Sequence, residues 1–333
     1  MSMKLSDERP LTAPSDQDTG SLAAQVLAAR HRLDRHDAGT AVSLFALVDT
    51  RGFPELRAAI ERHGGIAFAA LWDGTDLAPH RDISPLLITV VDGAKGIKGY
   101  EDKDDGDGDD GSLSLLNRLA ELPADGFMVT WLWSFCSLPE VEAHLRGYCE
   151  YALPDRRAFY LHFYDNRVLE RLRKVWTPEQ WSAFASIACE IWYRDRSGAP
   201  VVDAQHPVPV ESLTASAPVM TAEQHAALLE LGYADKIALQ LRDVYGTHLD
   251  PLSPDALYGA VQTQMERAAA YGITCEADML RYVAKGLLVS PEFDQHPEIH
   301  RRLQAARYGD LPFAVVLSDV GTAETPDTTD MER

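Results

Sequence analysis

One stretch of the chain, residues 127–172, constrains the fold more than any other. It begins with the apolar run FMVTWLW, which is typical of a buried strand. Ser137 and Glu140 follow with the S-x-x-E spacing, in which each side chain bonds a backbone N–H at the start of a helix. Two short apolar runs come next, and Asp165 stands where the N-cap of a second helix belongs. This order predicts an α/β domain whose polar side chains end elements rather than catalyse a reaction.

The flanking sequence, from residue 21 to residue 196, continues this pattern. Three more apolar runs have the composition of central strands that are covered on both faces of a sheet. They lie at 44–48, 66–72 and 86–91. Apolar residues at helical spacing mark 21–36, and Pro54 opens a further helix. We therefore predict an α/β fold for residues 21–196, with a mixed sheet flanked by helices.

The composition changes at the Pro-rich segment 197–219, which we interpret as a linker. Beyond it the start signals are helical only, with Thr221 and Gln224 in a capping box and Pro254 at a first helical position. An all-helical C-terminal lobe of about four helices is therefore predicted for residues 220–310. Two domains also suit the length, because 333 residues exceed the roughly 250–300 at which a single core tends to split.

Three segments lack the apolar periodicity of a folded element, and we expect them to be disordered. They are residues 1–20, the Gly- and Asp-rich loop 93–111 and the tail 318–333. Asp105 and Asp107 in the loop alternate as in an EF-hand calcium site. However, Asp110 stands where that loop needs Gly, and Leu116 stands where it needs a bidentate Glu. The loop is therefore expected to be a solvated segment, and no metal site is predicted.

The charge balance limits the class of partner. Lys and Arg number 31 and Asp and Glu number 51, which gives a net charge of -20 and argues against nucleic acid or an anionic membrane. No window approaches the roughly 20 apolar residues of a membrane span, and the N-terminus lacks the apolar core of a signal peptide. The four cysteines are scattered without a CxxC pair. A soluble, cytoplasmic protein with reduced thiols is expected.

Three residues invite an enzymatic interpretation, with His162 as a base, Asp165 as its orienter and Cys136 as a nucleophile. Each has a simpler role. A strand histidine fills a half-buried position, Asp165 suits an N-cap, and Cys136 follows an aromatic run that predicts a buried, inert thiol. The sequence has no GxSxG, HExxH or Walker motif. We expect no catalytic residue, no cofactor and no enzymatic activity.

Three sequence segments resemble the adaptor/chaperone family of bacterial type VI secretion systems, the Tap or TEC type that loads effectors. They are FALVDTRGFPELRAAIERHGGIAFAALWDG, SFCSLPEVEAHLRGY and FYLHFYDNRVLERL. The resemblance spans about residues 44–196, and 221–297 is similar to the C-terminal half that such adaptors often carry. It implies a cytoplasmic, non-enzymatic protein that binds a secreted effector, usually by the effector's N-terminal region, and passes it to a VgrG-type spike protein.

The family pattern falls on positions in five segments of this chain. They are Leu47 and Asp49; Leu71, Asp73 and Gly74; Ser134; His144, Leu145 and Arg146; and Phe163, Tyr164, Asp165, Arg167, Val168 and Leu169. Two positions depart from it, because His162 and Asn166 stand where the family usually has Arg and Pro. Asn166 forgoes the preset backbone angle of Pro at a helix start but keeps the Asp165 cap. Replacing Arg by His162 removes a fixed charge from the expected partner surface.

The predicted partner-binding residues combine the family positions with tryptophans, which suit either a core or an interface. They are Trp72, Asp73, Trp131, Trp133, Arg146, His162 and Arg167, and Ser137, Glu140 and Asp165 are assigned to structure. Two other classes of function stay open. One is a metal-dependent hydrolase that uses Asp105, Asp107, His162 or Cys136, and the other is a small-ligand sensor with a pocket at the sheet edge.

Overall fold

The computed structural model describes residues 22–36, 41–93, 119, 128–205 and 217–318. The expectations for residues 1–20, for the acidic run 101–110 and for the tail after residue 318 lie outside this part of the chain. The chain divides into two compact units. The first unit comprises 1–144, 185–192 and 202–213, and the second comprises 145–184, 193–201 and 214–333.

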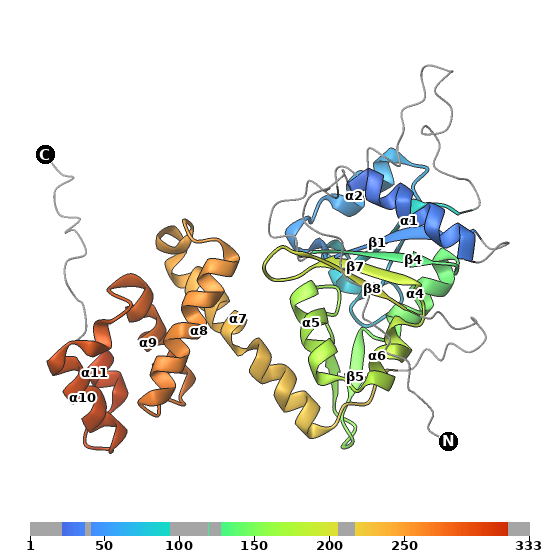
Figure 1. Ribbon diagram of the computed structural model, residues 1–333. Helices are drawn as coiled ribbons and strands as arrows, with labels where there is room; N and C mark the ends of the chain where they lie inside the picture. The colour runs from blue at the N-terminus through green and yellow to red at the C-terminus, as the bar shows by residue number, and fades with distance from the viewer. Residues whose placement is uncertain (1–21, 37–40, 94–118, 120–127, 206–216, 319–333) are drawn as a thin grey trace, which may run out of the picture. The chain divides into compact units, whose positions relative to one another are not determined.

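A six-stranded sheet has the strand order β2-β3-β1-β4-β7-β8 (Figure 1). Its strands are β1 (Ser43–Val48), β2 (Phe68–Ala70), β3 (Leu86–Val91), β4 (Val129–Ser134), β7 (Glu190–Arg194) and β8 (Pro200–Ala204). The pairs β1–β3, β1–β4, β2–β3 and β4–β7 are antiparallel. The predicted α/β class is confirmed, whereas these pairs are antiparallel where a mixture of directions was expected.

Both faces of the central strand β1 are buried, as its continuous apolar run predicts. Leu44, Ala46 and Val48 face the core of the first unit, and the alternate residues Phe45 and Leu47 are 1 % and 2 % exposed. β4 pairs with β1 in direct register, from Ser43↔Ser134 to Val48↔Val129, which places its own alternate residues on the same two faces. The two central strands β1 and β4 therefore lie in the interior.

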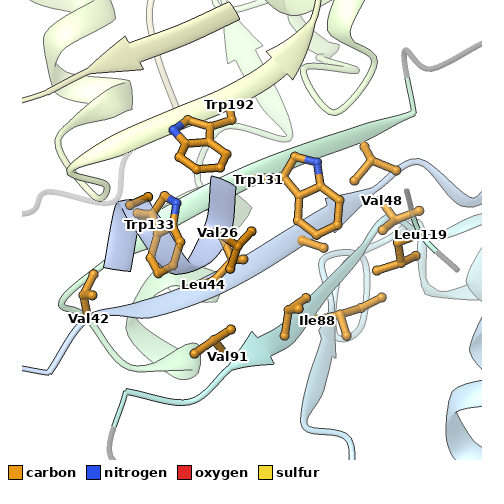
Figure 2. Close-up of a cluster of buried hydrophobic side chains, with 14 of the residues drawn as sticks. Val26, Val42, Leu44, Val48, Ile88, Val91, Leu119, Trp131, Trp133 and Trp192 are labelled. Atoms are coloured by element: carbon orange, nitrogen blue, oxygen red, sulfur yellow. The ribbon is translucent and has the colours of Figure 1, made fainter. Parts of the chain in front are cut away.

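The helices α1 (Leu22–His36) and α2 (Leu56–His63) pack on one face of these strands (Figure 1). Val26, Ala29 and Leu33 have the i, i+3, i+7 spacing of one helical face, and all three are buried in the core cluster. Figure 2 shows Val26 beside Leu44 and Trp133. Two short 3-10 helices, η1 (Thr50–Gly52) and η2 (Ala78–Ile83), connect elements of the same unit.

The second unit begins with a hairpin and two helices. These elements are β5 (Glu150–Ala152), β6 (Ala158–Tyr160), α5 (Asn166–Val175) and α6 (Pro178–Ala185); α4 (Leu138–Arg146) precedes them. α6 begins with a complete capping box, because Thr177 Oγ accepts from the backbone N–H of Gln180 at 3.2 Å and the Gln180 side chain accepts from Thr177 N at 2.9 Å. The sequence signals at 177–180 are thereby confirmed.

A helical lobe follows within the second unit, as predicted. It consists of α7 (Ala222–Leu249), α8 (Pro254–Ala270), α9 (Glu276–Leu288), α10 (Pro297–Arg307) and α11 (Phe313–Ser318), with the short η4 (Phe293–Gln295). The predicted capping box at Thr221 and Gln224 is present, Ser253 caps α8, and Gly272 has the positive φ of 77° that suits a helix stop. The described part of this lobe thus has five α-helices, one more than the roughly four that the sequence predicts.

One strand lies in the segment that composition assigned to a linker. Pro200–Ala204 forms β8 at an edge of the sheet, because an edge strand tolerates Pro at its first position and Val201 and Val202 favour extended backbone. The Pro-rich composition predicts a linker here and gives no sign of this short strand, whose side chains alternate between exposed and half-buried.

Candidate partner-binding site

The motif around Asp165 is built on a buried carboxylate. Asp165 is 6 % exposed and has extended backbone, so its side chain reaches forward and accepts the backbone N–H of Arg167 at 3.0 Å. The guanidinium of Arg167 folds back onto the same carboxylate through Nε at 2.9 Å and Nη2 at 2.7 Å. The residue therefore caps α5 and holds Arg167 in one orientation, which confirms its assignment as a helix cap.

The same Asp-x-Arg geometry occurs at two other places in the described chain. Asp49, 0 % exposed at the end of β1, accepts Arg51 N at 3.1 Å and binds the guanidinium of Arg51. Asp155, in the exposed turn between β5 and β6, accepts Arg157 N at 3.1 Å and Nε at 2.8 Å. Of the three aspartates with this geometry, Asp49 and Asp165 are buried, and both are positions of the family pattern. Each directly follows a buried segment of the chain.

The first helix signal of the motif region is only half a capping box. The Glu140 carboxylate accepts from Ser137 N at 2.6 Å, as the sequence predicts. Ser137 Oγ then donates to the same carboxylate at 2.7 Å instead of accepting the backbone N–H of Glu140. These two bonds from Ser137 lower the pKa of Glu140 below its usual value. Ser137 and Glu140 thus stabilise a helix start, through a geometry that differs from the ideal box.

The predicted partner-binding residues of the first unit divide by burial. Trp72, Trp131 and Trp133 are 5 %, 8 % and 0 % exposed, and Trp131 and Trp133 belong to the core cluster drawn in Figure 2. Burial favours the core role of these tryptophans over the interface role. Asp73 is exposed and forms an ion pair of 3.1 Å with Arg57.

The predicted residues of the second unit are Arg146, His162 and Arg167, and all three are half-buried. Nδ1 of His162 contacts the hydroxyl of Tyr164, two residues along the chain. His162 and Arg167 therefore flank the same buried segment, in which Phe163, Tyr164 and Asp165 are 0 %, 1 % and 6 % exposed. Each of these two predicted residues contacts a buried residue of the motif, His162 through Tyr164 and Arg167 through Asp165.

The three residues that invite an enzymatic interpretation, Cys136, His162 and Asp165, have structural contacts instead. Burial raises the pKa of the Cys136 thiol, so the reactive thiolate is scarce. Burial also raises the pKa of Cys149 and of Cys189 to about 12. The His162 ring contacts the Tyr164 hydroxyl, and the Asp165 carboxylate serves the cap and Arg167. Within the described residues no group of three or more His, Cys, Asp or Glu side chains is arranged to hold a metal ion.

A junction that sequence reasoning missed joins the motif helix α5 to the helical lobe. Asp235 of α7 binds Arg171 of α5 and, at 2.6 Å through Oδ2, Nη2 of Arg196. The Arg196 guanidinium also lies 3.6 Å from the ring centroid of Tyr258 in α8. Burial and the neighbouring arginine lower the pKa of Arg171, and burial lowers that of Arg196. Long-range pairs of this kind carry no local pattern.

Residues 44–183 match the family model DUF4123, described as a domain of unknown function. This match confirms the resemblance drawn from the sequence, since this domain is the one associated with the effector-loading adaptors of type VI secretion. No curated protein and no solved structure gives a significant match to the chain. In the part of the chain that the structure describes, no helix is long and apolar enough to cross a membrane.

Proposed function

We propose that this chain, which carries the DUF4123 domain of the type VI adaptor family over residues 44–183, is an effector-loading adaptor. It binds a cognate secreted effector, by the effector's N-terminal region, and loads it onto a VgrG-type spike protein. Its place of action is the cytoplasm. The family match is the observation that carries this proposal, and the DUF4123 adaptor family is not an enzyme family.

The geometry of the motif supports a binding role. The buried carboxylates of Asp49 and Asp165 each accept a backbone N–H at the start of a helical turn and bind the arginine two residues along the chain. These contacts are structural and not catalytic. Arg51 and Arg167 remain 37 % and 30 % exposed while their guanidinium groups are held in place. A cation that is fixed before binding loses little rotamer freedom when a partner arrives, which favours its use in recognition.

Affinity purification from the native host, with the neighbouring secretion genes intact, tests the proposal. The expected result is recovery of an effector and of a spike protein with the adaptor. A variant with Asp73→Ala and His162→Ala removes two predicted contact residues outside the core, and we expect it to recover less effector while keeping its melting temperature. Trp133→Ala is the matched control that acts through folding, because Trp133 is 0 % exposed. Recovery of neither partner by the unaltered protein would contradict the proposal.

A further inference from the structure

The long helix α7 belongs to a hydrophobic core only in its C-terminal half. Ala234, Ile237 and Leu241 are buried in the cluster that forms the core of the helical lobe. Every member of that cluster comes from residues 234–317, and none comes from the preceding elements β5, β6, α5 and α6. The helical lobe therefore has a hydrophobic core of its own.

Several polar groups of the N-terminal half of α7 bond these preceding elements. Gln224 Nε2 donates to the carbonyl of Val175, the last residue of α5, at 3.0 Å and to Gln180 Oε1 in α6 at 2.7 Å. His225 Nδ1 lies 2.8 Å from the hydroxyl of Tyr151 in β5, and its ring centroid lies 4.6 Å from that of Phe159 in β6. The start of α7 is thus bonded to three elements at once.

The second group of contacts lies about three turns further along α7, at Asp235. Arg171 and Arg196 both reach its carboxylate. Gly232 makes room for this approach, because a Cβ there would lie 2.9 Å from Arg171 Nη1. The side chains of Arg171, Arg196 and Asp235 are 15 %, 18 % and 19 % exposed, so solvent reaches these ion pairs. Gln224, Leu228, Gly232 and Asp235 have the spacing of one helical face.

Polar contacts of this kind hold two parts of a chain less firmly than a shared apolar core. Water offers hydrogen bonds to the same groups after separation, so the net stabilisation from each bond is small. Leu228 is the buried apolar residue of this half of α7, at 8 % exposure. Polar interfaces between parts of one chain resemble transient protein–protein interfaces, and their relative motion is the expected behaviour.

We propose that the contacts of Gln224, His225, Gly232 and Asp235 with residues 145–184 and 193–201 of the same unit form a reversible clasp. The clasp opens while the core of the helical lobe stays folded. Opening is a sub-global event, below the free energy of complete unfolding, and it leaves the N-terminal half of α7 with the marginal stability of an isolated helix. This conformational device does not depend on the adaptor function, so the clasp and the adaptor proposal can fail separately.

Hydrogen exchange on the full chain tests the clasp. In the unaltered protein, amides of residues 225–233 are expected to exchange faster than those of 279–284 in the lobe core, and high salt should speed the first group only. Asp235→Asn removes the carboxylate charge that both arginines share. We expect it to accelerate exchange at 225–233 by about 10- to 100-fold, as for the loss of a hydrogen bond to a charged group, and to leave 279–284 unchanged.

Glu276→Gln is the matched control, because it also removes a charge that pairs with α7. Glu276 bonds Lys236 at 2.6 Å and Gln240 at 3.1 Å, outside the clasp, so exchange at 225–233 should be unaffected. If Asp235→Asn does not fold, His225→Ala probes the other end of the clasp with the same expectation, because it removes the contacts with Tyr151 and Phe159 and leaves the capping box of α7 in place. The clasp is refuted if residues 225–233 exchange only together with 279–284, at every salt concentration and in each variant that folds.

Discussion

At the scale of single residues, Asp165 joins two stabilising roles in one buried carboxylate. Asp165→Ala removes the cap of α5 and leaves Arg167 without the carboxylate that holds it. Loss of a cap costs about 0.5–2 kcal/mol, and we expect the free energy of unfolding in urea to fall by at least that amount. Asp155→Ala is the control, since it removes the same Asp-x-Arg geometry from an exposed turn and should leave the free energy of unfolding nearly unchanged.

Effector binding by the Asp165→Ala protein should weaken only as far as folding does. The carboxylate faces its own backbone and Arg167, and the side chain is 8 % exposed. A large loss of binding at an unchanged melting temperature would mean instead that Asp165 contacts the partner directly.

A pair of helical glycines in the lobe allows a second test at this scale. A Cβ on Gly286 of α9 would lie 2.2 Å from Oε1 of the buried Gln264 in α8, so Gly286→Ala forces the Gln264 side chain out of its place between the two helices. Such overpacking typically costs about 1–3 kcal/mol. Gly259→Ala on the same lobe meets nothing within 4 Å and should stabilise α8 by up to about 1 kcal/mol. Equal effects of the two substitutions on thermal unfolding would contradict this packing.

At the scale of elements, the short helix η4 is held to α8 and α9 through one buried carboxylate. Asp294 is 4 % exposed, accepts from Tyr282 at 2.7 Å and pairs with Arg267. Burial favours the protonated acid, but the bonds from Arg267 and Tyr282 prevail and hold the pKa of Asp294 below its usual value. Because the folded pKa is depressed, the ionised carboxylate stabilises the fold above the unfolded pKa, about 3.9, and this contribution is lost as pH falls through the folded pKa.

Asp294→Asn should therefore destabilise the lobe most at neutral pH. Removing one partner of a fully buried ion pair costs about 3–5 kcal/mol, and we expect a smaller loss here because the Arg267 side chain is 27 % exposed. The difference in unfolding free energy between the unaltered chain and Asp294→Asn should begin to shrink below about pH 4, where the unfolded carboxyl is protonated, and should vanish once the pH falls below the depressed folded pKa, where the native carboxyl is neutral too. A difference that stays constant from neutral to acidic pH, measured by denaturant unfolding, would contradict this account.

The elements that sequence predicted well are those with local signals. Thr177, Thr221 and Ser253 cap helices as their spacing indicates, and the continuous apolar run of β1 correctly predicted a strand buried on both faces. Prediction failed where the cause is not local. β8 depends on pairing at the sheet edge, which the Pro-rich composition around it does not indicate, and Asp235 meets Arg171 across 64 positions of the chain. A mid-helix glycine, Gly232, was the one local sign of that approach.

At the scale of the whole molecule, two spectroscopic probes report on different regions of the chain. All six tryptophans lie between Trp72 and Trp192, whereas most of the helical residues lie in α7 to α11. Tryptophan fluorescence therefore follows the region that matches the DUF4123 model and the strands next to it, while far-UV circular dichroism is dominated by the helical lobe. A protein with one shared core would give coincident transitions by the two probes.

Because the lobe core draws every member from residues 234–317, we expect the two urea transitions to differ in midpoint. Asp235→Asn should widen the separation, since it weakens the charged contacts through which one region stabilises the other. Glu276→Gln should leave the separation unchanged, because its partners Lys236 and Gln240 lie on the lobe itself. Coincident transitions in both the unaltered chain and Asp235→Asn would mean that polar contacts across α7 couple the two regions as strongly as a common apolar core does.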